Sequence, residues 1–145
     1  MSPAHRELAH RLGYAGLAPF VLGAGLIWLI GDRDLDQHAF VSMGLSAYAG
    51  LVVAFLGGIH WGLAFTHDLP GSQPLVWGVS AALLGWLGVL MAPYAGLALH
   101  GGVLIACYVF DRRVYAQLGA AGWLTLRFRL TAVAALSCFL AAAGS

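Results

Sequence analysis

Charge is scarce in this sequence. Only 9% of its 145 residues are Asp, Glu, Lys or Arg, and lysine does not occur at all. Soluble globular domains carry about 25% charged residues. Because 61% of the residues are also hydrophobic, the composition excludes a soluble globule and is typical of an integral membrane protein.

Cysteine is nearly absent as well. Cys107 and Cys138 are the only two, and they fall inside the fourth and fifth apolar runs. In antiparallel neighbouring helices they would lie toward opposite ends, so their Cα atoms should exceed the limit of about 7 Å for a disulfide. We expect both to be buried as small apolar side chains.

Several functional patterns are missing. No basic, aromatic-interleaved stretch indicates nucleic acid, and no repeat with a period of about 20–50 residues is present. The HExxH pattern of zinc enzymes and a nucleophile–base pair are also absent. We therefore predict no nucleic-acid partner, no metal site, no catalytic residue and no cofactor.

What is present is a series of uncharged apolar runs. About 20 such residues span a bilayer core of about 30 Å. We predict an all-α polytopic membrane protein, in which residues 1–145 form one domain of five transmembrane helices. The predicted spans cover residues 12–30, 41–65, 75–92, 94–110 and 124–144. The remainder is too short for a soluble domain of at least about 40 residues, so function must come from the bundle and its rims.

Arginines indicate the orientation. The first apolar run is longer than the roughly 7–15 residues of a signal peptide, so we expect it to remain as the first helix. One side of the bundle would then hold Arg6, Arg11, Arg112, Arg113, Arg127 and Arg129, and the other side would hold Arg33. Cytoplasmic loops carry the excess of arginine. We predict a cytoplasmic N-terminus and a C-terminus on the opposite side.

The connector GDRDLDQH carries Asp32, Asp34 and Asp36. These alternate like the start of a calcium loop, but the glycine and the glutamate that complete such a loop are missing. A solvated acidic connector is the favoured interpretation.

The stretch FLGGIHWGLAFTHD places His60 and Trp61 among Gly57, Gly58 and Gly62. His60 would lie about 7.5 Å below the cytoplasmic end of the second helix. The glycines satisfy GxxxG, which usually means close helix packing, and they also leave room beside the imidazole for a ligand. Trp61 fits either an interfacial aromatic belt or the wall of such a pocket.

Asp111 is expected at the C-terminus of the fourth helix, where the helix dipole disfavours a negative charge, so we expect an arginine partner. Only residues 130–145 follow Arg129, so Arg127 and Arg129 must belong to the first turns of the fifth helix. Because they are two residues apart, one can pair with Asp111 while the other extends toward lipid phosphate.

These side chains converge on the cytoplasmic leaflet. Ionisable groups at membrane depth indicate a functional site when they face the bundle. The predicted polar cluster contains His60, Asp111, Arg112, Arg113, Arg127 and Arg129. In the alternative interpretation, the arginines only fix topology and bind head groups, and His60 donates to a backbone carbonyl.

Four stretches, LGYAGLAPF, AYAGLVVAFLGGIHWGLA, FDRRVYA and LRFRLTAVAALS, resemble the domain of unknown function 3429 family of transmembrane protein 69-like membrane proteins. The resemblance extends over nearly the whole chain, and GGIHWG and LRxRL are its most specific parts. It implies a small multi-spanning protein of bacterial inner membranes, or of mitochondrial inner membranes in a eukaryote. It implies no particular activity.

Three functions compete. The favoured one is a non-enzymatic module that binds a membrane lipid, a quinone or another small amphipathic or anionic ligand. His60 would hydrogen-bond this ligand, Trp61 would pack on it, and Arg127 or Arg129 would neutralise it. The second is an accessory or assembly subunit of a larger complex, or a homo-oligomer, docked through small residues. The third, a membrane enzyme or proton-coupled transporter that titrates His60, is disfavoured because His100 is the only further ionisable group near the midplane.

Overall fold

The computed structural model describes residues 2–68, 71–117 and 121–145, which form helices and no strands. Five helical segments are long and apolar enough to span a membrane, with α1 and α2 counted together as one. The all-α fold with five membrane-spanning helical segments is confirmed. The helices are α1 (Pro3–Ala15), α2 (Ala18–Ile30), α3 (Leu35–Thr66), α4 (Gln73–Leu90), α5 (Pro93–Gln117) and α6 (Leu124–Gly144), with a short 3-10 turn η1 (Ala121–Trp123) before α6.

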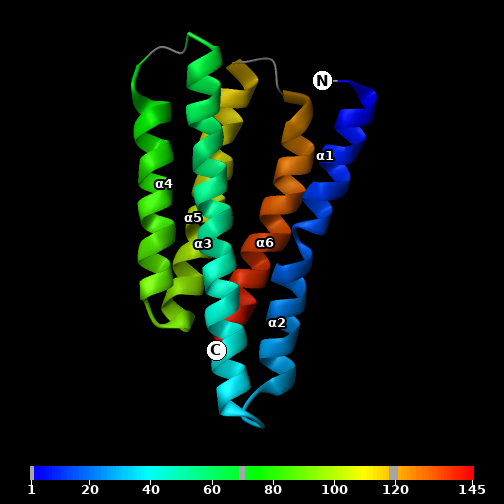
Figure 1. The fold of residues 1–145 in the computed structure, drawn as a ribbon, viewed down its shortest axis with the longest axis vertical. Coiled ribbons are helices and arrows are strands. Elements are labelled where there is room, and N and C mark those ends of the chain that lie inside the picture. Colours follow the sequence, from blue (N-terminus) through cyan, green and yellow to red (C-terminus); the bar gives the residue numbers. More distant parts are fainter. Residues whose placement is uncertain (1, 69–70, 118–120) are drawn as a thin grey trace.

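The helices form one bundle in which α3 packs most extensively on α4, and α5 on α6 (Figure 1). The N-terminus and the C-terminal ends of α3 and α5 lie together at the top of Figure 1. This is the arginine-rich end, and it contains Arg6, Arg11, Arg112, Arg113, Arg127 and Arg129. Arg33 lies at the opposite end, between α2 and α3. The arginines are therefore separated along the bundle as the sequence predicts.

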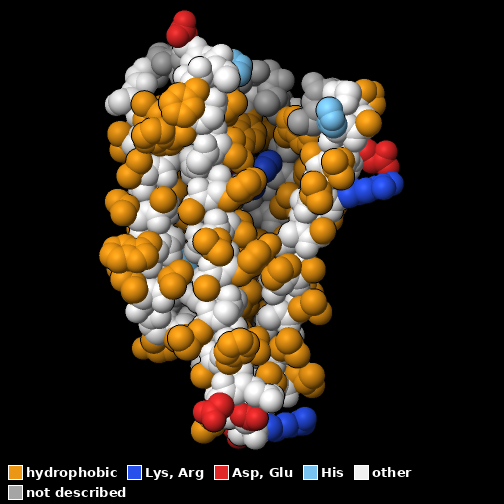
Figure 2. All heavy atoms as spheres, in the orientation of Figure 1, with side chains coloured by type: hydrophobic (Ala, Val, Ile, Leu, Met, Phe, Trp, Pro, Cys, Tyr) orange, Lys and Arg blue, Asp and Glu red, His pale blue; other side chains and the backbone are white. Residues whose placement is uncertain are grey.

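Large apolar side chains cover the outside of the bundle (Figure 2). The interior combines small residues with a few large ones such as Phe20 and Leu104. Ala49, Val53 and Cys107 are fully buried, whereas Phe55 and Trp86 are more than half exposed. Lipid, rather than water, suits such a surface. Both cysteines are free and buried, as predicted.

The first predicted span is present, but it consists of two helices rather than the single helix expected from the sequence. Helix α1 ends at Ala15 and α2 begins at Ala18. The cause is Pro19, which has no N–H to donate and whose ring clashes with the carbonyl four residues earlier, at Ala15. Hydropathy continues across this point and does not reveal the break. The Tyr48 hydroxyl donates to the Gly16 carbonyl at 2.7 Å and so binds the break to α3.

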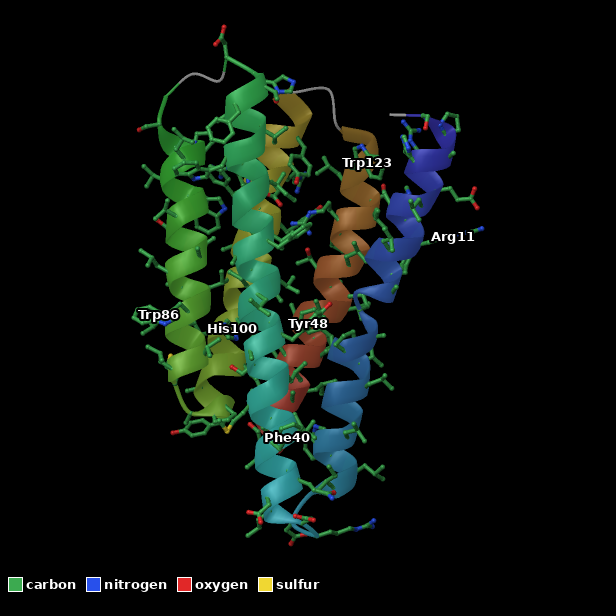
Figure 3. The ribbon with its side chains drawn as sticks, in the orientation of Figure 1. Arg11, Phe40, Tyr48, Trp86, His100 and Trp123 are labelled. Carbon is green, nitrogen blue, oxygen red and sulfur yellow. The ribbon has the colours of Figure 1, made fainter. Side chains whose placement is uncertain are left out.

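Helix α1 is also held at its polar end. Trp123, labelled in Figure 3 near the start of α6, packs against the His10 ring with centroids 5.4 Å apart. The Arg6 guanidinium lies over the same indole at 5.8 Å. These contacts set α1 beside α6 and leave a space between α1 and α3.

Two helices extend beyond their predicted bounds. Helix α3 begins at Leu35 rather than residue 41, because the Asp34 carboxylate caps it by accepting a hydrogen bond from the Gln37 N–H at 3.1 Å. Helix α5 continues to Gln117 rather than ending at residue 110. Asp111 therefore lies inside the helix and not at its C-terminus, so the dipole argument for its partner is wrong. The predicted span ended where charged residues begin, at Asp111. Charged residues mark the end of an apolar span, but they do not end a helix.

Candidate functional site

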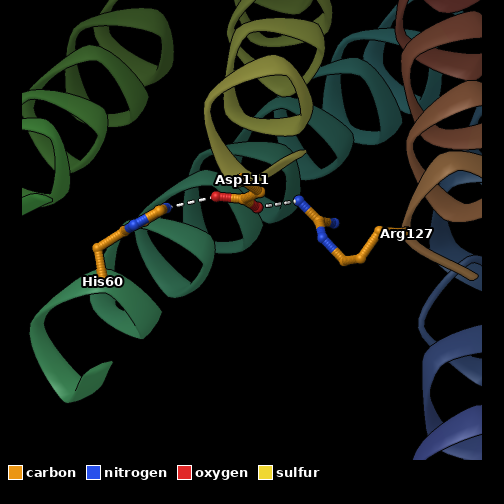
Figure 4. A network of polar contacts seen from close by, with 3 residues as sticks. All are labelled: His60, Asp111 and Arg127. Carbon is orange, nitrogen blue, oxygen red and sulfur yellow. Dashed lines mark hydrogen bonds and ion pairs between the residues drawn. The ribbon is translucent and has the colours of Figure 1, made fainter. Parts of the chain in front are cut away.

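Three helices each contribute one side chain to a buried polar triad of His60, Asp111 and Arg127 (Figure 4). The His60 Nε2–H, from α3, donates to one carboxylate oxygen of Asp111 on α5. Arg127, from α6, donates from Nη2 to the other oxygen at 2.5 Å. His60 and Asp111 are completely buried, and the Arg127 side chain is 11% exposed.

Aromatic side chains of α4 and α5 lie beside the triad. The His60 ring meets Phe110 edge to face with centroids 5.0 Å apart, and Trp77 stacks on Phe110 at 5.3 Å. This apolar surrounding strengthens each hydrogen bond and raises the penalty for breaking one.

The triad has no net charge when His60 is neutral. The tautomer with its proton on Nε2 satisfies Asp111, whereas His60 Nδ1 is buried without a partner in the described part of the chain. In that tautomer the Arg127 and Asp111 charges cancel.

An apolar groove of about 640 Å³ runs along α1, α2, α3 and α6 and reaches the triad at Arg127. Figure 2 shows the hollow between α3 and the α1–α6 side, with a cationic side chain inside it. Apolar and aromatic side chains dominate its lining, among them Leu12, Phe20, Tyr48, Phe55, Leu104 and Leu130.

Two polar groups in this groove lack a partner. Arg127 Nε and Thr131 Oγ1 are both buried, and neither makes a hydrogen bond within residues 2–68, 71–117 and 121–145. They lie four residues apart, on one face of α6, and both line the groove. Buried polar groups are nearly always hydrogen-bonded. Each atom has almost no accessible surface, so an occupant of the groove could accept these bonds only after the Arg127 or Thr131 side chain turned toward it.

The remaining predicted site residues lie outside the triad. Trp61 is 38% exposed, and its indole N–H donates to the Leu75 carbonyl at 3.0 Å. Arg112, Arg113 and Arg129 are exposed. Of the two candidate partners for Asp111, the structure selects Arg127 and leaves Arg129 facing outward, as the two-residue spacing predicts.

The three glycines near His60 differ in their surroundings. A Cβ atom at Gly57 would lie 2.7 Å from the Gly78 carbonyl oxygen of α4, so Gly57 permits a close helix contact. A Cβ at Gly58 or Gly62 would meet no atom within 4 Å. Packing through these two is not made within the described chain, and packing against another molecule stays a prediction.

A second buried histidine lies toward the opposite end. His100, labelled in Figure 3, donates from Nε2 to the Gly85 carbonyl of α4 at 2.8 Å. Glycines surround it: a Cβ at Gly50 would come within 2.9 Å of the same Gly85 oxygen. His100 therefore links α5 to α4 at a point where α3 also packs closely on α4. Among the described residues, no three His, Cys, Asp or Glu side chains group as a metal site.

Thr131, Tyr48 and Trp77 were not identified from the sequence. For Thr131 a signal existed, because it follows Arg127 by four residues and must share its helical face. Tyr48 and Trp77 carry no such signal, since their roles depend on where α1 and α5 pack.

Comparison with known proteins confirms the family resemblance of the sequence. The family described as "Protein of unknown function (DUF3429)" matches residues 5–143. Transmembrane protein 69 of Xenopus tropicalis is 35% identical over 82 residues, a match that covers 54% of this chain and only 31% of that protein. No solved structure matches. Since the family match extends over nearly its whole length, the chain belongs to the DUF3429 family of membrane proteins.

Proposed function

We propose that this protein is a non-enzymatic membrane module that binds a small amphipathic molecule, such as a lipid or a quinone, in the groove. The apolar part of the ligand lies between α1, α3 and α6, and its polar end lies at Arg127 and Thr131. One observation carries this proposal: the lining of the apolar groove includes Arg127 and Thr131, each of which has a buried polar atom without a partner among the described residues.

The size and chemistry of the groove support ligand binding. Its volume of about 640 Å³ lies within the range of about 300–1,000 Å³ for small-molecule sites. Such sites are mainly apolar, with a few polar groups that fix orientation. The hollow also lies on the outer face of the bundle (Figure 2), so a ligand could enter from the bilayer.

The predicted site residues divide into two groups in this proposal. Arg127 contacts the ligand, while Asp111 and His60 hold Arg127 in place. Trp61, Arg112, Arg113 and Arg129 are exposed at the same end, where an indole or a guanidinium can contact lipid head groups.

We further infer an inner membrane, bacterial or mitochondrial, with the arginine-rich end on the cytoplasmic or matrix side. The separation of six arginines from Arg33 along the bundle supports this orientation.

A groove-filling substitution tests the proposal. Leu130 lines the groove opposite Gly13, where a Cβ would lie 3.1 Å from Leu130 Cδ1. Leu130→Trp should therefore close the groove. Leu136→Trp is the matched control, because Leu136 is on the same helix and 59% exposed.

The measurement is native mass spectrometry of gently solubilised protein, with extraction of co-purifying small molecules. We expect a bound molecule in the wild type and in Leu136→Trp, and its loss in Leu130→Trp. A wild type without any specific small molecule, or equal retention in both variants, would contradict the proposal.

An accessory or assembly role is the second candidate. The observation that favours it is the open face of α3 at Gly58 and Gly62, where a Cβ meets nothing within 4 Å. Small residues of this kind allow another helix to approach closely. If a defined protein partner co-purifies and Gly58→Leu or Gly62→Leu abolishes this, an accessory or assembly role would be favoured over ligand binding.

A further inference from the structure

We infer that the polar end of the ligand is an uncharged hydrogen-bond acceptor, such as the carbonyl of a quinone or of a neutral lipid ester, and not an anionic phosphate. This head-group class rests on the proposed function of the groove. It differs from the anionic ligand for which the arginines alone would argue.

The first reason is that the charge of the groove is already neutralised. Arg127 is the one charged residue among the described residues that line the groove. Its guanidinium is already paired with Asp111 at 2.5 Å. Both oxygens of Asp111 are engaged, one with His60 and one with Arg127. An anion bound to Arg127 would therefore lie close to a buried carboxylate, and repulsion between like charges is strong where water is excluded.

The second reason is the kind of hydrogen bond left open. Arg127 Nε–H can only donate, and the Thr131 hydroxyl can donate or accept. Neither has a partner in the described structure. Tyr48 also lines the groove, but its hydroxyl proton is already used on the Gly16 carbonyl. Both atoms are buried, so the two side chains must turn toward the ligand; a carbonyl oxygen, with two lone pairs, could then accept from both donors.

A matched pair of probes tests the head group. Diacylglycerol and phosphatidic acid with identical acyl chains differ only in the phosphate, and decylubiquinone supplies a carbonyl acceptor of the other type. Binding of each to the purified full-length protein in neutral-lipid nanodiscs would be measured, with Leu130→Trp defining binding outside the groove.

We expect the wild type to bind diacylglycerol, decylubiquinone or both more tightly than phosphatidic acid. The stronger of the two neutral probes distinguishes a lipid ester from a quinone. Thr131→Val, which removes one donor without changing size, should weaken that probe by about three- to tenfold while thermal unfolding stays close to that of the wild type.

Asp111→Asn adds a second prediction. It removes the neutralising charge and leaves the groove with a net positive charge, so preference should shift toward phosphatidic acid. If this variant does not fold, the wild-type preference and Thr131→Val still decide the matter.

Groove binding of phosphatidic acid as tight as, or tighter than, both neutral probes would overturn the head-group class and leave the proposed function intact. Failure of every probe, together with no co-purifying molecule, would overturn both.

Discussion

Asp111 accepts hydrogen bonds from side chains on two other helices, and it is completely buried. A buried carboxylate is tolerated only when charged or donating groups surround it. Conversely, Arg127 has no other acidic partner among the described residues. Each member of the triad therefore depends on the other two.

Asp111→Ala should lower the free energy of unfolding by about 3–5 kcal/mol, because it leaves the Arg127 charge buried and unpaired. Arg129→Ala, at an exposed arginine two residues away, should change it by no more than about 0.5 kcal/mol. Denaturant or thermal unfolding in detergent would measure both. Equal stability of the two variants would show that the triad does not hold these helices together.

For single residues, the sequence predicts that Asp111 pairs with either Arg127 or Arg129. Residues two apart on a helix point in different directions, so only one of the two arginines can face Asp111. The sequence also places His60 correctly in a polar cluster. The position of Trp61 could not be predicted, because adjacent residues on a helix point in different directions and only the packing of α4 shows which one faces inward.

Helix packing around α3 depends on which glycines face a neighbour. Gly57 lies against Gly78 of α4, and Gly58, the next residue, faces outward. Sequence alone does not separate them, since both belong to the same small-residue motif.

Gly57→Ala should therefore be destabilising by about 1–3 kcal/mol, because the added methyl overlaps the Gly78 backbone. Gly58→Ala is the control and should be neutral, or slightly stabilising through higher helix propensity. Unfolding of the isolated protein in detergent would compare them. A larger loss for Gly58→Ala would mean that α3 is rotated about its axis from the orientation described above.

The break between α1 and α2 is the main structural feature that the predicted spans did not include. Apolar residues continue on both sides of it, so hydropathy indicates one span. Pro19 was visible in the sequence, but a proline in a membrane helix can kink it without breaking it. Pro19 causes the break here, and the contacts of Tyr48 and Trp123 hold the two helices in their separate positions.

The proposed orientation of the whole molecule rests on the number of spans and the arginines. An odd number of crossings would place the two termini on opposite sides of the membrane, and the arginine bias favours the N-terminal side as the cytoplasmic one. Both inferences need only the sequence. The groove could not be predicted, since it depends on how α1 leaves the axis of α2.

Labelling from one side of the membrane tests the orientation. Cys107 and Cys138 are fully buried, so they should remain unreactive in the folded protein. A membrane-impermeant maleimide added to spheroplasts should label Gln37→Cys and not Ala4→Cys, which should react only after permeabilisation. Both positions are exposed. The reverse pattern would contradict a cytoplasmic N-terminus.

The triad also imposes an order on biosynthesis, because its three members lie far apart along the chain. The ribosome delivers His60 on α3 first, Asp111 on α5 second and Arg127 on α6 last. Until α6 inserts, the carboxylate lacks its cation and the groove lacks one wall. A nascent chain that stops before Leu124 would thus present an acid without its cation at the membrane, a feature by which quality-control proteases could distinguish it from the finished protein.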